Sequence, residues 1–450
     1  MLCMHFLALQ LFSPSNIEKE IIRMNEKYRA EGKDLNQKQE GVELATIAQN
    51  AKEYSKIFAR ELQEGQYKVM PAKLVEIETN GKKRTLYLFN LNDSILHGTV
   101  SNIIHTFCQQ AGIYSPNLKS YIKGENHWKT LKGFAAFVRA YHRSPVAKKE
   151  RGLYILRRDI ASYTDEIPVH DQSLLWPLLK KELKFPESPS ANESLAWEYT
   201  RQVIQTEATA KNGKTFKKML GVPTGSPIST TLFNFYSIEL DRVLDSLSLQ
   251  FYARYGDDII AADTSRSLID EASAIILTTL AKYELRPNQK KLESYYLNNA
   301  GRHLAHPIIN TTHPNPYPGR THILFLGCNI KADGTISLSK KEKNLILEDL
   351  KQRFSHIDPR LPPPLKLPLL CQAAAIALDP EQPLCQKSAI LLRYNITDRK
   401  CLNEIDMRIA LEVLYALTKT RSPRGFRLFP LHEMRKQGLP CLTTIRNSVS

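Results

Sequence analysis

An α+β fold is predicted by the order of apolar runs in the central part of the 450-residue sequence. Residues 153–160 (LYILRRDI) have the pattern of a short buried strand that ends at Asp159, and residues 251–263 (FYARYGDDIIAAD) have the pattern of a β-hairpin with acids at its turn. Residues 229–247 and 267–285 have apolar residues at helical spacing. The order strand, helix, hairpin, helix and strand is typical of a split βαβ sheet with helices on one face.

The flanking segments are predicted to be mainly helical. Residues 15–66 and 94–142 have helical periodicity, and residues 67–90 alternate like two strands joined by a turn at Asn80-Gly81. Residues 322–339 predict another hairpin, and the chain beyond 340 predicts helices separated by proline-rich linkers. The apolar residues 1–12 have no basic region and are too few to span a bilayer, so we expect a packed N-terminal segment or a start codon assigned too early, with Met24 as the alternative start.

The net charge of +16 indicates a polyanionic partner. Lys and Arg are concentrated in residues 119–158 and 419–446, where they alternate with aromatic residues that can stack on bases. This pattern favours nucleic acid over a membrane surface. The seven cysteines are scattered and include no CxxC pair, which argues against a disulfide framework and a structural zinc site. We therefore expect a cytoplasmic protein with no membrane partner.

The acidic turn is the strongest candidate site. Two adjacent carboxylates, Asp257 and Asp258, cannot both enter a core without a compensating charge. A divalent cation would supply it, and oxygen ligands favour Mg²⁺. Asp159 also ends an apolar strand and is the candidate for a third carboxylate; three such groups could hold two metal ions about 3.5–4 Å apart for nucleotidyl transfer. A solvated acidic hairpin is the alternative.

Five segments in a fixed order extend this pattern. They are RRDIASYTDEIP (157–168), GVPTGSPISTTLFNFYSIELD (221–241), YARYGDD (252–258), LRPNQKK (285–291) and FLG (325–327). Together they resemble the reverse transcriptase family, and their wording is most similar to bacterial defence-associated and abortive-infection members. The resemblance covers roughly residues 150–340, with looser similarity from about residue 90.

The resemblance implies roles for individual residues. It places two Mg²⁺ ions on the catalytic aspartates, and it counts the residue after the first of them among the metal-binding positions. The implied metal-binding residues are Asp159, Ile160, Asp257 and Asp258. The three aspartates among them are also the implied catalytic residues. The implied substrate-binding residues are Arg158, Tyr163, Thr164, Gly225, Ser226, Pro227 and Lys291. The sequence offers Ser226 no identifiable His and Asp partners, which argues against a hydrolase.

The resemblance also implies a right-hand polymerase. We expect an N-terminal extension over residues 1–89, fingers and a ferredoxin-like palm over residues 90–340, and an α-helical thumb that binds nucleic acid over residues 341–450. The expected function is cDNA synthesis from dNTPs on a dedicated structured non-coding RNA in antiphage defence. Template-independent or protein-primed DNA synthesis by the same site is an alternative. A non-catalytic RNA-binding scaffold is another, although such a scaffold has no use for three clustered carboxylates.

Two positions depart from the family pattern. The Gln that the family often has ahead of the glycine turn is missing, and Leu220 or Gly221 stands near its place. The second departure concerns the sugar of the nucleotide. The family usually has an aromatic residue five positions after the first aspartate, which excludes ribose 2′-hydroxyls. Thr164 stands there, with Tyr163 immediately before it. Either Tyr163 takes over this role, or discrimination against ribonucleotides is relaxed.

Overall fold

The computed structural model describes residues 5–30, 39–79, 82–144, 152–210, 212–297, 305–307, 322–379, 389, 391–392 and 395–447. The described chain is a mixture of helices and strands, which agrees with the predicted α+β class. It divides into two compact units, each built from separated segments. The first comprises Met1–Gly124, Arg157–Ala261 and Ser267–Leu292, and the second comprises Glu125–Leu156, Ala262–Arg266 and Glu293–Ser450.

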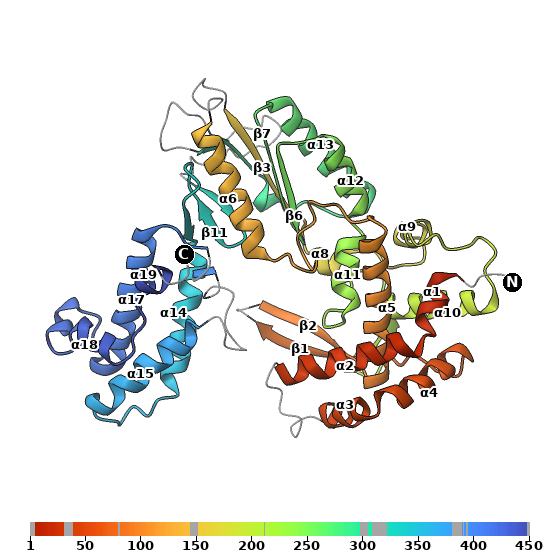
Figure 1. The fold of residues 1–450 in the computed structure, drawn as a ribbon, viewed down its shortest axis with the longest axis horizontal. Coiled ribbons are helices and arrows are strands. Elements are labelled where there is room, and N and C mark those ends of the chain that lie inside the picture. Colours follow the sequence, from red (N-terminus) through yellow and green to blue (C-terminus); the bar gives the residue numbers. More distant parts are fainter. Residues whose placement is uncertain are drawn as a thin grey trace. The chain divides into compact units, whose positions relative to one another are not determined.

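Helices dominate the N-terminal part of the first unit (Figure 1). In chain order they are α1 (Phe6–Leu11), α2 (Pro14–Ala30), α3 (Gln39–Gln49), α4 (Ala51–Gln63) and α5 (Leu91–Gln110). Leu7 and Leu11 are fully buried, which confirms the expected packed N-terminal segment. Helix α5 ends before Gly112, whose φ of +65° lies in the left-handed region that glycine adopts without a Cβ clash.

A four-stranded sheet in the first unit has the order β2-β1-β4-β5. Its strands are β1 (Ala72–Thr79), β2 (Lys82–Leu88), β4 (Glu207–Thr209) and β5 (Thr215–Lys217). Strands β1 and β2 pair antiparallel, as predicted, and the predicted turn at Asn80-Gly81 lies outside the described residues. Strand β4 follows α10 (Ala191–Ile204) and pairs parallel with β1, with Ala72 opposite Ala208. The sequence alone did not predict this pairing.

The predicted central elements are also present. Strands β6 (Phe251–Tyr255), β7 (Asp258–Asp263) and β3 (Leu153–Asp159) are neighbours in the order β6-β7-β3. Helix α13 (Arg266–Lys282) follows the hairpin. The single helix expected over 229–247 is wrong, because the structure has α11 (Ile228–Phe235) and α12 (Ile238–Ser246) with a break at Tyr236-Ser237. Ser237 adopts a non-helical φ and ψ of −102° and 12°, and its hydroxyl hydrogen-bonds to a tyrosine outside the helix.

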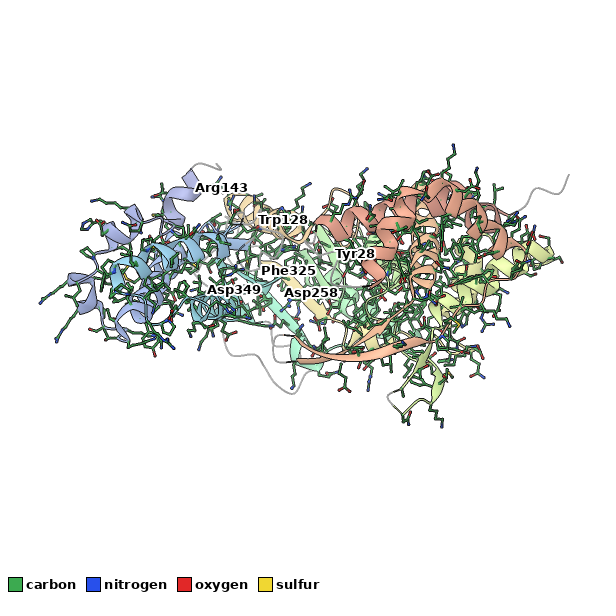
Figure 2. All side chains as sticks on the ribbon, turned by 90° about the horizontal axis from the view of Figure 1, so that it is seen from below. Tyr28, Trp128, Arg143, Asp258, Phe325 and Asp349 are labelled. Atoms are coloured by element: carbon green, nitrogen blue, oxygen red, sulfur yellow. The ribbon has the colours of Figure 1, made fainter. Side chains whose placement is uncertain are left out.

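The second unit contains α6 (His127–Arg143), two small groups of strands and the C-terminal helices. Strands β8 (Glu293–Leu297) and β9 (Ala305–Pro307) pair antiparallel. The hairpin expected over 322–339 has a third strand, since β10 (Ile323–Phe325), β11 (Cys328–Ile330) and β12 (Ile336–Leu338) form one antiparallel sheet. The ring of Phe325, labelled in Figure 2, lies 5.7 Å from that of Phe134 on α6.

The helices predicted beyond residue 340 are confirmed, but the linker expected over residues 358–368 is wrong in part, because α15 begins at Pro363 and contains Pro368. They are α14 (Lys340–Ser355), α15 (Pro363–Ala377) and α17 (Arg399–Thr418), followed by the short α18 (Leu431–Lys436) and α19 (Leu442–Asn447). The first three pack against one another in pairs. Throughout the described ranges, no helix has both the length and the apolar composition that crossing a membrane requires.

Candidate active site

Asp159 ends β3 and is almost completely buried, with 2% of its surface exposed. Two side chains from the segment after α13 hold its carboxylate: Lys291 Nζ lies 2.5 Å from Oδ1, and Asn288 Nδ2 donates to Oδ2 at 2.9 Å. The backbone amide of Asn288 also donates to the carbonyl of Asp159, at 2.7 Å. A buried carboxylate without a compensating charge would be costly, so Lys291 accounts for the burial of Asp159.

Asp257 and Asp258 occupy the turn of the β6–β7 hairpin. Gly256 has a φ of +64°, which allows the chain to reverse tightly here. Asp257 lies in the turn, and Asp258, labelled in Figure 2, begins β7. The amide of Ile160 donates to the carbonyl of Asp257 at 3.1 Å, which joins this turn to the end of β3. The hairpin and β3 therefore bring the three aspartates to the same end of these neighbouring strands.

The carboxylates influence one another electrostatically. Desolvation by nearby protein atoms and the charges of Asp258 and Asp159 raise the pKa of the Asp257 carboxyl group to about 6, although Asp257 as a residue is exposed to solvent. Asp258 is paired differently, because its Oδ1 accepts a hydrogen bond of 2.8 Å from the buried Arg157. Asp159 and Asp258 thus each have a basic side chain beside them, whereas Asp257 has none at hydrogen-bonding distance among the described residues.

The donor set fits a hard divalent cation. Carboxylate oxygens are the ligands that Mg²⁺ prefers, and a cation would relieve the repulsion that raises the pKa of Asp257. No three His, Cys, Asp or Glu side chains within the described ranges gather closely enough to coordinate an ion as they stand. The carboxylate of Asp159 faces Lys291 instead, and that of Asp258 faces Arg157. Metal binding at this end of the strands therefore requires these side chains to yield carboxylate oxygens.

Of the two predicted basic substrate-binding residues, only Lys291 has its charged group beside the aspartates. Arg158 is 3% exposed, and its guanidinium donates to Ser273 Oγ on α13 at 2.8 Å and to the carbonyl of Arg157 at 2.9 Å. These contacts give Arg158 a structural role in joining β3 to α13. Its neighbour Arg157 is the one that reaches the acidic hairpin, through Asp258.

The two residues predicted to face the nucleotide sugar, Tyr163 and Thr164, differ in burial. Tyr163 is 4% exposed, and its hydroxyl contacts the carbonyl of Phe233 at 2.7 Å and Ser237 Oγ at 2.5 Å. Its ring lies 5.4 Å from that of Phe233. Thr164 is half-buried, and its carbonyl accepts a hydrogen bond from the amide of Val222. Tyr163 is therefore part of the packed interior, whereas Thr164 retains solvent contact.

The predicted glycine turn precedes α11. Gly225 has a φ of +105°, and Ser226 and Pro227 follow it directly before the helix begins. Ser226 Oγ lies 2.7 Å from Nδ1 of the fully buried His97 on α5. Burial lowers the pKa of His97 to about 3, so the imidazole is neutral at pH 7. Sequence reasoning missed this contact, because nothing in the sequence relates two residues so far apart.

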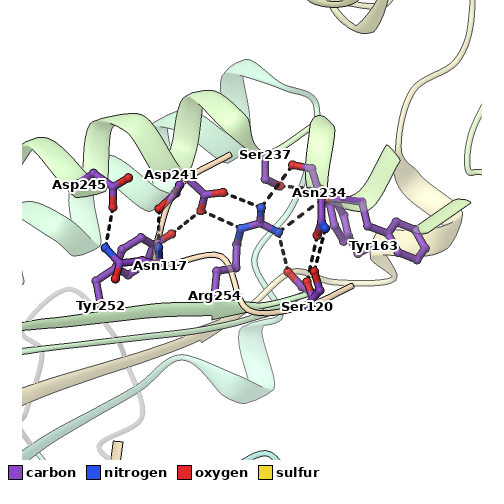
Figure 3. Close-up of polar contacts among 12 residues, drawn as sticks. Asn117, Ser120, Tyr163, Asn234, Ser237, Asp241, Asp245, Tyr252 and Arg254 are labelled. Carbon is purple, nitrogen blue, oxygen red and sulfur yellow. Dashed lines mark hydrogen bonds and ion pairs between the residues drawn. The ribbon is translucent and has the colours of Figure 1, made fainter. Parts of the chain in front are cut away.

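A buried ion pair connects the hairpin to α12 beneath the turn (Figure 3). The guanidinium of Arg254 on β6 is fully buried and contacts Asp241 at 2.6 and 2.8 Å. The same guanidinium donates to the carbonyls of Gly256, Asn234 and Phe233 at 3.1, 3.3 and 3.5 Å. It therefore fixes the acidic turn relative to both helices. Sequence reasoning missed this pair as well.

Comparison with known protein families matches residues 52–330 to the family described as "Reverse transcriptase (RNA-dependent DNA polymerase)". The match covers more than half of the chain, and the chain belongs to this family. It is accordingly a nucleotidyltransferase with RNA-directed DNA polymerase activity, which implies a nucleic acid template and dNTP substrates. Domains of this family generally use divalent metal ions, typically Mg²⁺. No curated protein matches the sequence.

Proposed function

We propose that Asp159, Asp257 and Asp258 are the reaction centre of this polymerase and hold two Mg²⁺ ions, with Ile160 at the same site. The observation that carries the proposal is that these three aspartates lie at the same end of neighbouring strands. When bound, the ions would activate the primer 3′-hydroxyl and neutralise charge on the triphosphate of the incoming nucleotide. Lys291 and Arg157 hold the carboxylates of Asp159 and Asp258 in place until the substrates arrive.

The surroundings of the carboxylates suggest how substrate is oriented. Lys291 lies at the Asp159 side of the centre, where its charge would attract the triphosphate of the dNTP. Thr164 and the glycine turn at Gly225, Ser226 and Pro227 are joined through Val222 and would line the nucleotide site. His97 holds the Ser226 hydroxyl from the interior and is a positioning residue in this scheme.

We further propose a dedicated structured non-coding RNA as template, with the cDNA acting in bacterial antiphage defence. The resemblance of the motifs to defence-associated members supports this role, as does the basic character of residues 119–158 and 419–446. In the same proposal, residues 90–340 are fingers and palm, and residues 341–450 are a thumb that binds nucleic acid. Residues 1–89 are an extension.

The experiment compares wild type, the Asp257→Ala/Asp258→Ala double variant and a Glu271→Ala control. Glu271 is exposed on α13, so its loss tests a general effect of removing acid. We expect the double variant to incorporate no dNTP on poly(rA)/oligo(dT) and to keep its RNA affinity in filter binding, because phosphates are held by Lys and Arg. Incorporation above a few per cent of wild type would show that the reaction centre lies elsewhere.

A second measurement identifies the template. RNA and DNA that co-purify with wild type and with the double variant are sequenced. One enriched RNA in both samples, with complementary DNA in the wild type alone, is the expected result. DNA without a complementary RNA would favour template-independent or protein-primed synthesis.

A further inference from the structure

The segment before α6 is attached to the outer edge of the acidic hairpin. Leu118 forms a parallel bridge with Arg254 on β6. The amide of Lys119 donates to the carbonyl of Arg254 at 2.9 Å, and the amide of Arg254 donates to the carbonyl of Asn117 at 3.0 Å. Residues 117–119 thus extend the strands beyond β6, on the side away from β7 and β3.

A second set of hydrogen bonds fixes the next residue. Ser120 is fully buried, and its hydroxyl donates to Asn234 Oδ1 at 2.9 Å. Asn234 Nδ2 on α11 returns a hydrogen bond of 2.8 Å to the carbonyl of Ser120 (Figure 3). The backbone on the N-terminal side of Tyr121 is therefore held by both β6 and α11.

Tyr121 itself is exposed and strained. Its φ of +55° lies in the left-handed region, which is strained for a residue with a Cβ. The side chain is nevertheless 52% exposed, and its ring lies 6.4 Å from that of Phe233. Dehydration and the nearby carboxylate of Asp257 raise the pKa of its hydroxyl. An exposed ring is thus held beside α11, on the segment that pairs with the strand leading into the acidic turn.

The two reactants would approach from different sides. Lys291 and Asn288 hold Asp159 at the end of β3, which is the side proposed for the triphosphate. Tyr121 is attached to β6, and the order β6-β7-β3 places the acidic turn between them. Its ring is therefore on the β6 side of the acidic turn, beside Phe233 and opposite the side proposed for the triphosphate, and this side remains for the primer 3′ end.

We infer that Tyr121 contacts the 3′-terminal nucleotide of the primer and positions it at the acidic turn. The inference rests on the proposed reaction centre. An aromatic face can stack on a base or lie against a sugar with little dependence on sequence, which suits a residue that meets every successive primer end. The strained backbone is tolerated because it presents the ring to this nucleotide.

The test uses Tyr121→Gly, Tyr121→Phe and a Phe216→Ala control. Glycine removes the ring and also relieves the left-handed backbone, so this variant should be at least as stable as wild type. Phenylalanine keeps the ring. Phe216 on β5 is another exposed aromatic residue of the first unit, at 41% exposure. Initial rates on poly(rA)/oligo(dT) are measured with primer–template and dTTP varied separately.

We expect Tyr121→Gly to raise the KM for primer–template by about tenfold, the size of one lost stacking contact, with the KM for dTTP unchanged. Tyr121→Phe and Phe216→Ala should stay within about twofold of wild type. An unchanged KM for primer–template in an active Tyr121→Gly enzyme overturns the inference, as does a rise in the KM for dTTP alone. A wild type that incorporates nothing would instead contradict the proposed function.

Discussion

Replacing Arg254 by Met would remove the charge at the centre of the buried network and leave an unbranched, uncharged side chain. Asp241 would then remain buried at 1% exposure without its cation, although Tyr252 still donates a hydrogen bond to it. The carbonyls of Gly256 and Asn234 would also lose their donor. Every partner of the guanidinium is thus either a buried carboxylate or a backbone carbonyl.

Removing one partner of a buried ion pair costs about 3–5 kcal/mol. We expect Arg254→Met to destabilise the first unit by about 3 kcal/mol, at the low end because Tyr252 still contacts Asp241. The Arg254→Met/Asp241→Leu double variant removes both charges. Because it leaves no unpaired ion, it should recover about 2 kcal/mol of this loss.

Urea unfolding followed by tryptophan fluorescence measures both variants, since Trp176 and Trp197 lie in the first unit. The unfolding midpoint and the slope with urea together give the change in free energy. A loss below about 1 kcal/mol in Arg254→Met, or no recovery in the double variant, would refute this account of the ion pair.

Three further outcomes are expected. Burial lowers the pKa of His97 to about 3, below its unfolded value of about 6.5, so the stability that the neutral imidazole contributes is complete above pH 6.5 and declines as pH falls. The wild type should therefore lose about 2 kcal/mol of unfolding free energy between pH 7 and pH 5 in urea unfolding, and His97→Gln should abolish this loss. An unchanged pH dependence in His97→Gln would contradict this prediction. Thr164→Phe should increase discrimination of dNTPs over rNTPs by about tenfold in competition assays, since rejecting one added hydroxyl needs a steric block; equal discrimination in both enzymes would refute it. Changing the exposed Arg424 and Arg427 to Gln should lower the log–log salt slope of RNA binding by about 1.4–1.8, and an unchanged slope would mean that this face binds no phosphate.

The sequence predicted those parts of the fold that local patterns determine. The segments before Asp159 and around Asp257 and Asp258 are strands, as their short runs of apolar and aromatic residues predicted. The pairing of β4 with β1 has no such local pattern. Each strand of the β4–β5 pair has three residues, and all three positions of β5 are exposed. Such short strands are defined by their partners.

The candidate site shows the same division. The segment with Lys291 was predicted from its motif, and the structure places its amine beside Asp159. Arg157 and Arg158 are adjacent in sequence, and only Arg157 faces the acidic hairpin. Successive side chains of a strand point to opposite faces, so a sequence with two arginines in a row does not tell which of them reaches the carboxylate.

The buried groups were the hardest to predict. Arg254 is part of the strand pattern before the acidic turn, where an arginine suggests solvent or a phosphate. Its burial depends on Asp241, which belongs to the helical pattern of α12 and has no sequence feature that distinguishes it from a surface acid. The break at Ser237 depends likewise on a hydroxyl contact with Tyr163, from another segment.

The parallel pairing of β1 with β4 has a consequence for synthesis of the chain. Lys73 faces Thr209, which leaves the ribosome on the order of ten seconds later at about 5–20 residues per second. During that interval the nascent β1–β2 hairpin has an unpaired edge, and such edges recruit other strands. Translation speed and chaperones that cover this edge therefore bear on the yield of active protein. A fragment that stops before Glu207 would keep the edge open permanently and should aggregate.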